Sequence, residues 1–158
     1  MARSGLVALG VVVSLLLLGC SSGPVRRVSE PAASIQQLTV HANGSWTVDL
    51  RLQNYSSIPM RFERARLTLT VDDQSAGTID ASPGLSVGPE SADVVSVPFQ
   101  PESGGRMVLA DVLASRRSLS YSLDGTLSAT PEDGKVRDFK VEGKNTLSPV
   151  PGLDGVLR

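Results

Sequence analysis

From residue 46 to residue 53 the chain alternates strictly between apolar and polar side chains. The apolar positions are Trp46, Val48, Leu50 and Leu52. Successive side chains of a β-strand point to opposite faces, so this period of two gathers the apolar set on one face, which a helix would not do. The segment therefore predicts a half-buried antiparallel strand.

The next apolar pattern, over residues 60–71, changes phase part-way along. Met60 and Phe62 stand at even positions, whereas the apolar residues from Ala65 to Val71 stand at odd positions. One extra residue near Glu63-Arg64, a β-bulge, would bring both sets to the same face. We therefore expect one long strand that contains a bulge at this point.

The remaining strands are predicted from the same kind of alternation, at residues 34–40, 74–80, 93–100, 118–129 and 136–147. Pro98 cannot donate a ladder hydrogen bond, which indicates an edge strand or a bulge, and Gly125 indicates a bulge in its own strand. Residues 81–92 contain two glycines and two prolines and predict a loop. For residues 148–158 we expect a tail, either free or packed back on the domain.

One segment departs from the strand period. The positions with helical spacing are Met107, Val108, Ala110, Asp111, Leu113 and Ala114. We predict a short helix there, with Ser103-Gly104-Gly105 before it and Arg116-Arg117 near its end, where positive charge is favourable. About seven strands, with turn signals roughly every 8–15 residues, predict an all-β antiparallel sandwich or barrel that carries this one helix.

The N-terminal residues have the pattern of an export signal. Arg3 precedes a thirteen-residue apolar run from Leu6 to Leu18, which as a helix is about 20 Å long, too short for a ~30 Å hydrocarbon core. The run ends in Leu-Leu-Gly-Cys, which resembles a bacterial lipobox, with Cys20 as the lipidation site; an ordinary signal peptide is the alternative. We expect residues 1–19 to be a lipoprotein signal peptide, residues 20–33 a lipid-anchored tether and residues 34–158 one domain.

Lipidation at Cys20 would have several consequences. Several acyl chains make membrane attachment effectively permanent, and the chain has no second cysteine for a disulfide. Fourteen tether residues would reach at most about 50 Å. In lipoproteins of Gram-negative bacteria, Ser21 rather than Asp after the cysteine implies the outer membrane, so the expected location is its periplasmic face. Arg26-Arg27 are expected either to be solvated or to touch lipid head groups.

Composition and charge limit the kinds of ligand and reaction that the chain could support. Without residues 1–19 the net charge is about −2, which excludes gross attraction to nucleic acid or anionic lipid. His41 is the only histidine, and its place beside a turn is typical of an exposed residue. Asp72-Asp73 and Glu132-Asp133 lack calcium-loop spacing and are typical of turns. We therefore expect no catalytic set, no metal site and no cofactor.

Two surface features remain as candidates for binding. Arg64 and Arg66 share one face of a strand, which is either a solvated outer face or a patch for an anionic ligand or partner. The strand edge from Val94 to Val97 could accept a partner strand. Neither feature suggests a small-molecule substrate.

The order of several short pieces resembles the LEA-14/WHy (water stress and hypersensitive response) domain over residues 34–150. The pieces are Asn54, Ile58-Pro59, Ala76-Gly77, Val97-Pro98 and the Tyr-Ser-Leu-Asp-Gly run from Tyr121 to Gly125. Many members have Asn-Pro-Asn where this chain has Asn-Tyr-Ser. The resemblance implies a fibronectin-III-like or immunoglobulin-like sandwich and transfers no catalytic residue.

Two functions are consistent with these patterns. The first is a membrane-anchored, non-enzymatic lipoprotein that protects envelope proteins under desiccation, osmotic or other stress, as the resemblance implies. The alternative is an accessory protein–protein interaction module of a cell-envelope complex. Both give the protein a membrane anchor at Cys20 and client or partner proteins in the envelope, and neither involves an enzyme activity.

Overall fold

The structure is a computed structural model, and it describes residue 23 and residues 25–158. The predicted signal peptide and the lipidation site Cys20 lie outside the described residues. Within the described part of the chain there are nine strands and one helix. They are β1 (Ala32–Val40), β2 (Trp46–Gln53), β3 (Met60–Val71), β4 (Gln74–Ala81), β5 (Leu85–Val87), β6 (Ala92–Phe99), α2 (Ser103–Ser115), β7 (Leu119–Pro131), β8 (Arg137–Leu147) and β9 (Val156–Leu157).

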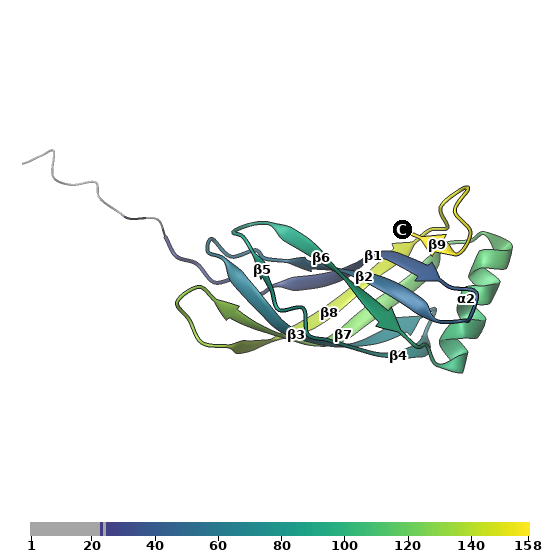
Figure 1. The fold of residues 1–158 in the computed structure, drawn as a ribbon, viewed down its shortest axis with the longest axis horizontal. Helices are drawn as coiled ribbons and strands as arrows, with labels where there is room; N and C mark the ends of the chain where they lie inside the picture. The colour runs from purple at the N-terminus through teal and green to yellow at the C-terminus, as the bar shows by residue number, and fades with distance from the viewer. Residues whose placement is uncertain (1–22, 24) are drawn as a thin grey trace, which may run out of the picture.

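The strands form two antiparallel sheets that face each other (Figure 1). One sheet has the order β6-β2-β1-β9, and the other has the order β4-β3-β7-β8 with β5 also paired to β3. The helix α2 covers one end of the sandwich, and the chain enters at the opposite end (Figure 1). The predicted all-β sandwich with one short helix is therefore confirmed.

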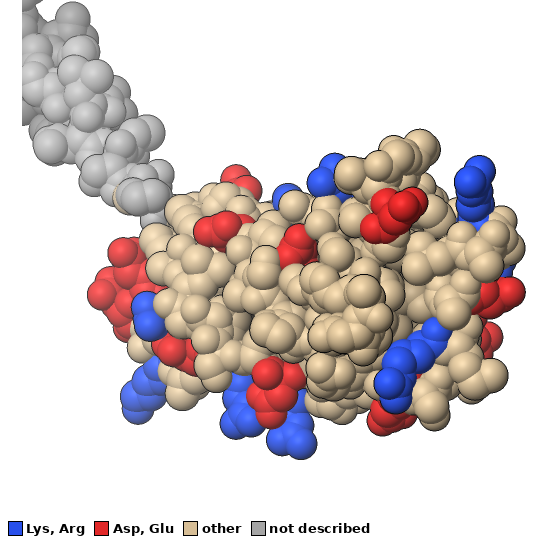
Figure 2. Space-filling model, turned by 45° about the vertical axis from the view of Figure 1, so that its right-hand side comes forward, with Lys and Arg blue, Asp and Glu red and all other residues tan. Residues whose placement is uncertain are grey.

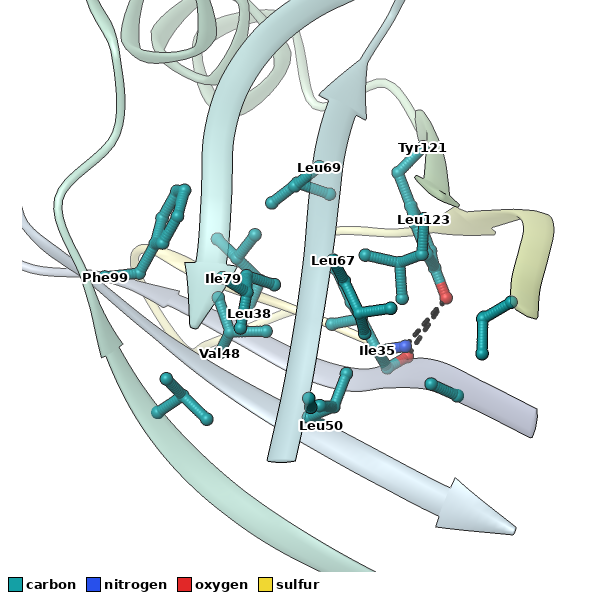
Figure 3. Packing of buried hydrophobic residues seen from close by; sticks show 14 of the residues in the cluster. Ile35, Leu38, Val48, Leu50, Leu67, Leu69, Ile79, Phe99, Tyr121 and Leu123 are labelled. Atoms are coloured by element: carbon teal, nitrogen blue, oxygen red, sulfur yellow. Dashed lines mark hydrogen bonds between the residues drawn. The ribbon is translucent and has the colours of Figure 1, made fainter. Parts of the chain in front are cut away.

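The core lies between the two sheets and consists of the inward-facing apolar positions. From one sheet come the four alternating residues of β2, all at most 1% exposed. From the other come Leu67 and Leu69 of β3 and Leu123 of β7, which point into the same space (Figure 3). Fully burying a Leu or Val side chain contributes about 1.5–3 kcal/mol, so this set can hold the domain together without a disulfide.

Two details of the strand prediction are confirmed. The pairing of β3 with β7 shifts register between Phe62 and Arg64, at the expected bulge. Residues on both sides of the shift, Phe62 and Ala65, are fully buried. Pro98 lies in β6, which is an edge strand, so its missing N–H removes no bond from the middle of a sheet.

Other details were wrong. The predicted loop at residues 81–92 contains β5, which pairs with the start of β3 through Leu85 opposite Phe62. The helix begins at Ser103, so Gly104 and Gly105 belong to it and do not precede it. A Cβ on Gly105 would lie 2.8 Å from the Cβ of Ala76, so glycine there lets the helix approach β4.

No bulge occurs at Gly125. The pairing of β7 with its neighbours runs without a shift through this residue, which is opposite Leu67 in β3 and Val141 in β8. A Cβ on Gly125 would lie 2.1 Å from the carbonyl oxygen of Arg66. The glycine is therefore required by the close approach of two backbones.

Both ends of the described chain pack against the sandwich. At the C-terminal end, β9 pairs with β1, and Leu157 is fully buried, so the tail packs back on the domain. At the N-terminal end, β1 begins at Ala32, and several residues before it bind to the domain. The backbone N–H of Arg27 donates to Ser57 Oγ at 2.8 Å, and that of Ser29 donates to Ser56 Oγ at 2.9 Å.

Candidate functional site

The segment Val25–Ser29, which we call the strap, occupies part of the predicted tether. It lies along the loop between β2 and β3, and Ser57 binds it at three points. Ser57 Oγ accepts from Arg27 and donates to the Val25 carbonyl at 2.8 Å, and the Ser57 N–H donates to the Arg27 carbonyl at 3.0 Å. The strap, which falls within the predicted tether, is therefore bonded to the domain.

The two strap arginines make ion pairs at this end of the sandwich. Arg26 lies 3.3 Å from Asp133 and 3.7 Å from Glu132, both in the turn between β7 and β8. Arg27 lies 3.4 Å from Glu90. All of these side chains are about half exposed or more, so each pair contributes little stability.

Asn54, the first piece of the resemblance, organises the same end. Its side chain is fully buried. The amide nitrogen lies within 3.2 Å of the carbonyl oxygens of Ile58, Val87 and Gly88, and the side-chain oxygen accepts from the Ser56 N–H at 2.9 Å. Asn54 therefore holds two loops to each other, and its role in this structure is architectural.

Tyr121, another piece of the resemblance, joins the two sheets. It projects from β7 toward β1, where its hydroxyl accepts from the Ile35 N–H at 2.9 Å (Figure 3). The pairing of β1 with β2 shifts register between Ile35 and Gln37, and the tyrosine binds the backbone at that bulge. Burial raises the pKa of the Tyr121 hydroxyl, and its hydrogen bond to Ile35 partly opposes this rise.

The predicted arginine face is occupied by an internal partner. Arg64 and Arg66 both lie on the exposed face of β3. Arg64 donates two hydrogen bonds to the Asp80 carboxylate, at 3.0 Å and 2.6 Å. These bonds lower the pKa of Asp80 and raise the pKa of Arg64. One of the two guanidinium groups of this face, that of Arg64, is therefore already bound to a carboxylate of the neighbouring strand.

The predicted β6 edge is partly blocked for strand addition. Of the described strands, only β2 pairs with β6. The Val94 N–H donates to the side chain of its neighbour Asp93 at 2.8 Å, and Pro98 has no N–H to donate. Antiparallel ladders direct alternate residues outward, so of positions 94, 96 and 98 only Ser96 keeps an outward N–H. Native edge strands are commonly protected in this way.

The other residues considered in the sequence lie apart from one another. His41 is exposed, and its Nε2 lies 2.8 Å from Thr47 Oγ1. Asp72 accepts from the Ser120 N–H at 3.0 Å and pairs with Arg117 at 2.5 Å, so it ties the turn after β3 to the end of α2. Among the described residues, no three histidine, cysteine or acidic side chains converge on a point where a metal ion could sit.

The described surface carries several open grooves, of which two lie near residues considered above. One, of about 520 Å³, lies between the end of α2 and the C-terminal loop and includes Leu113 and Leu153. The other, of about 600 Å³, runs along the outer face of β7 and includes Asp73 and Lys144. Charged side chains of both signs are interspersed over the surface (Figure 2). Of the helices that the structure describes, none has the length and apolar character needed to cross a bilayer.

Sequence reasoning missed the serines that bind the strap and the hydroxyl that joins the sheets. Ser56 and Ser57 follow Asn54 directly, in a segment that shows only as a break between two strands. Their one signal is the resemblance itself, which includes the asparagine. Nothing in the sequence indicates that Tyr121 would reach a backbone group 86 residues away.

Comparison with known proteins identifies the class of fold. No family model matches the sequence, and no curated protein is detectably similar to it. The chain is similar in structure to AT1g01470 from Arabidopsis thaliana, with a TM-score of 0.54 and 14% identity, over 87% of this chain and 93% of that one. At this identity the match shows a shared β-sandwich fold and nothing about activity.

Two other solved structures are similar to this chain at TM-scores below 0.5. One is a protein from Archaeoglobus fulgidus, with a TM-score of 0.41 and 13% identity over 78% of this chain and 100% of that one. Another is At2g46140.1, a candidate late embryogenesis abundant (LEA) protein, with a TM-score of 0.42 and 14% identity over 90% of this chain and 87% of that one.

Proposed function

We propose that this chain is a membrane-anchored, non-enzymatic lipoprotein whose LEA-14/WHy-like domain protects envelope proteins under desiccation, osmotic or other stress. The anchor is a set of acyl chains on Cys20, and the location is the periplasmic face of the outer membrane. The domain acts by covering the surfaces of client proteins weakly and reversibly, and it carries out no chemistry on them.

The observation that carries this proposal is the place of the LEA-14/WHy-like pieces in the sandwich. Asn54 closes one end, Ala76 of β4 lies against Gly105 of the helix, and Gly77 lies beside Phe99. Tyr121 joins the two sheets. The pieces therefore stand where the fold needs specific residues. This supports a shared domain type beyond a coincidence of short motifs.

The hydrogen bonding of the interior supports the proposal that the protein stays folded as water is withdrawn. Within the described residues, every buried side-chain nitrogen or oxygen has a hydrogen-bond partner in the protein itself. A buried polar group that loses its partner costs about 1–3 kcal/mol. The hydrogen bonds that these side chains make within the protein therefore favour a fold that persists as water is withdrawn.

The interaction-module alternative has less support. Its two candidate surfaces are the Arg64/Arg66 face and the β6 edge. The first is engaged with Asp80, and the second is interrupted by Asp93 and Pro98.

Drying a reporter enzyme tests the proposal. Lactate dehydrogenase is dried with vesicles that carry the full lipidated chain, and its activity after rehydration is measured. The control is the same vesicles with an equal mass of an unrelated lipoprotein. We expect greater recovery with this chain, and equal recovery would contradict the protective function. Incorporation of a radioactive fatty acid, compared with the Cys20→Ala variant, tests the anchor separately.

A further inference from the structure

The end of the sandwich that carries the strap is also the end nearest to the proposed lipid anchor. The strap begins at Val25, whose carbonyl accepts from Ser57. Only residues 21–24 separate it from Cys20. Four residues reach at most about 14 Å, whereas a free tether of fourteen residues would reach about 50 Å. The strap therefore shortens the connection between the domain and the proposed lipid anchor.

The exposed apolar side chains gather at this same end. Six large hydrophobic residues are exposed in the described part of the chain, and four of them are Val25, Val28, Tyr55 and Val136. Val25 and Val28 belong to the strap, Tyr55 lies in the loop that binds it, and Val136 lies in the turn between β7 and β8. Arg26 binds that turn through Glu132 and Asp133. The loops and the strap thus form one continuous surface, which we call the strap end.

The chemistry of the strap end suits a bilayer interface. Tyrosine is enriched at the level of the lipid head groups, where an apolar ring and a polar tip are both satisfied. Tyr55 is 51% exposed and Val136 is 60% exposed, so both side chains are accessible to a bilayer. The acids Glu90, Glu132 and Asp133 are also present, and the strap arginines lie beside them. Contact of this surface with a bilayer is therefore favoured by its apolar side chains and by the short anchor, and not by a net positive charge.

We propose that the strap end of the domain rests on the bilayer, with Val25, Tyr55 and Val136 at the level of the lipid head groups. The proposal rests on the lipid anchor proposed above. The strap holds the sandwich upright, so that α2 is the part farthest from the membrane. The strand β3 has twelve residues and spans about 40 Å between these two ends. Client proteins would then meet the helix end and the outer faces of the sheets.

Fluorescence quenching in vesicles tests this orientation. The full lipidated chain is placed in vesicles of phosphatidylethanolamine and phosphatidylglycerol, some of which carry a nitroxide on the head group. Cys20 is the only cysteine and is acylated, so Val136→Cys or Met107→Cys each adds one thiol for a fluorescent probe. We expect strong quenching at position 136 and several-fold weaker quenching at position 107, on α2. Equal quenching at both positions would overturn the proposal, as would binding of the strap end to a protein partner that removes quenching at position 136.

The strap itself is tested with Ser57→Ala in the Val136→Cys background. Ser57 Oγ makes the bonds to Arg27 and Val25, so its loss should lower quenching at position 136. The matched control is Ser115→Ala, which removes an exposed hydroxyl bonded to the Asp111 carbonyl of α2 and should leave quenching unchanged. Unchanged quenching in Ser57→Ala would overturn the role of the strap. Fatty-acid labelling of Cys20 is measured in each sample: labelled protein with equal quenching overturns only the orientation, whereas unlabelled protein overturns the anchor.

Discussion

The two ends of the sandwich are closed by different physical means. At the helix end, α2 packs on β4 so closely that Gly105 leaves no room for a side chain, and Trp46 lies beside it with Phe99, ring centroids 5.7 Å apart. At the strap end, two buried polar side chains, Asn54 and Ser56, bond the loops to each other and to the strap. One end is therefore closed by the fit of apolar surfaces and the other by hydrogen bonds.

The difference determines how each end should respond to mutation. Tightly packed apolar surfaces tolerate little added volume, because protein interiors have few voids. The loss of a buried polar group leaves its partners without hydrogen bonds, whatever the change in volume. The same kind of small substitution should therefore have different consequences at the two ends.

Asn54→Ala should have the largest effect. The change leaves the buried carbonyl of Ile58 and the N–H of Ser56 without their partner, and each unpaired buried group costs about 1–3 kcal/mol. We expect the free energy of unfolding, measured with urea, to fall by about 3 kcal/mol. Asn145→Ala is the matched control, because its side chain is exposed and binds only the Thr146 N–H. Equal losses in the two variants would mean that the strap end does not depend on this amide.

The helix end is tested by two neighbouring glycines. Alanine in place of a helical glycine stabilises by up to about 1 kcal/mol when it fits. At Gly104 the new Cβ would meet its nearest atom, the Ser75 carbonyl oxygen, at 3.6 Å, whereas at Gly105 it would lie 2.8 Å from Ala76 Cβ. We expect Gly104→Ala to raise the thermal midpoint, and Gly105→Ala to destabilise by about 2 kcal/mol through overpacking. A higher thermal midpoint in both variants would show that α2 can move away from β4.

How far the fold can be predicted from sequence is illustrated by two bulges. In β3 the change of phase between Phe62 and Ala65 is clear, because long apolar runs lie on both sides of it, and the bulge was predicted. In β1 the buried residues Ile35 and Leu38 are also out of phase, yet this bulge was not predicted. The strand has few strongly apolar residues, so the period is established on neither side of the shift.

The parts that sequence could not predict depend on contacts between distant segments. The three residues of β5 read as loop because so short a strand has no period of its own, and only pairing with β3 defines it. The strap has a composition typical of a linker, and only Ser56 and Ser57 hold it in place. The lipidation site Cys20, by contrast, is predicted from local sequence alone and lies outside the described residues.

The middle of the sandwich is tested by Tyr121→Phe. The variant keeps the buried ring but leaves the Ile35 N–H without its acceptor. We expect a loss of about 1 kcal/mol in the free energy of unfolding at pH 7, less than at either end. A loss as large as that of Asn54→Ala would mean that one hydroxyl between the sheets matters as much as the whole strap-end network.

The same tyrosine predicts a dependence on pH. Burial raises the pKa of Tyr121 in the folded protein, above the value near 10 that it has when unfolded. Its contribution is therefore fully present below pH ~10 and is lost as the pH rises toward the folded pKa, because the unfolded state ionises first. Urea unfolding of the wild type should weaken more steeply above pH ~10 than that of Tyr121→Phe. Parallel curves for the two proteins would contradict this.

Ser57→Ala should have the smallest effect on global stability and the most local one. The hydroxyl is bonded to the strap and not to the core, so the free energy of unfolding should change by less than about 1 kcal/mol. Hydrogen exchange should nevertheless quicken at the Arg27 and Ser57 amides, because both are bonded across this contact. Ser96→Ala, which removes a hydroxyl of β6 bonded to Asp49 of the neighbouring strand β2, should leave both amides unchanged. Exchange at these two amides that stays slow in Ser57→Ala would mean that the Arg26 and Arg27 ion pairs hold the strap without the serine. The hydrogen-bonded closure of this end would then not include the strap.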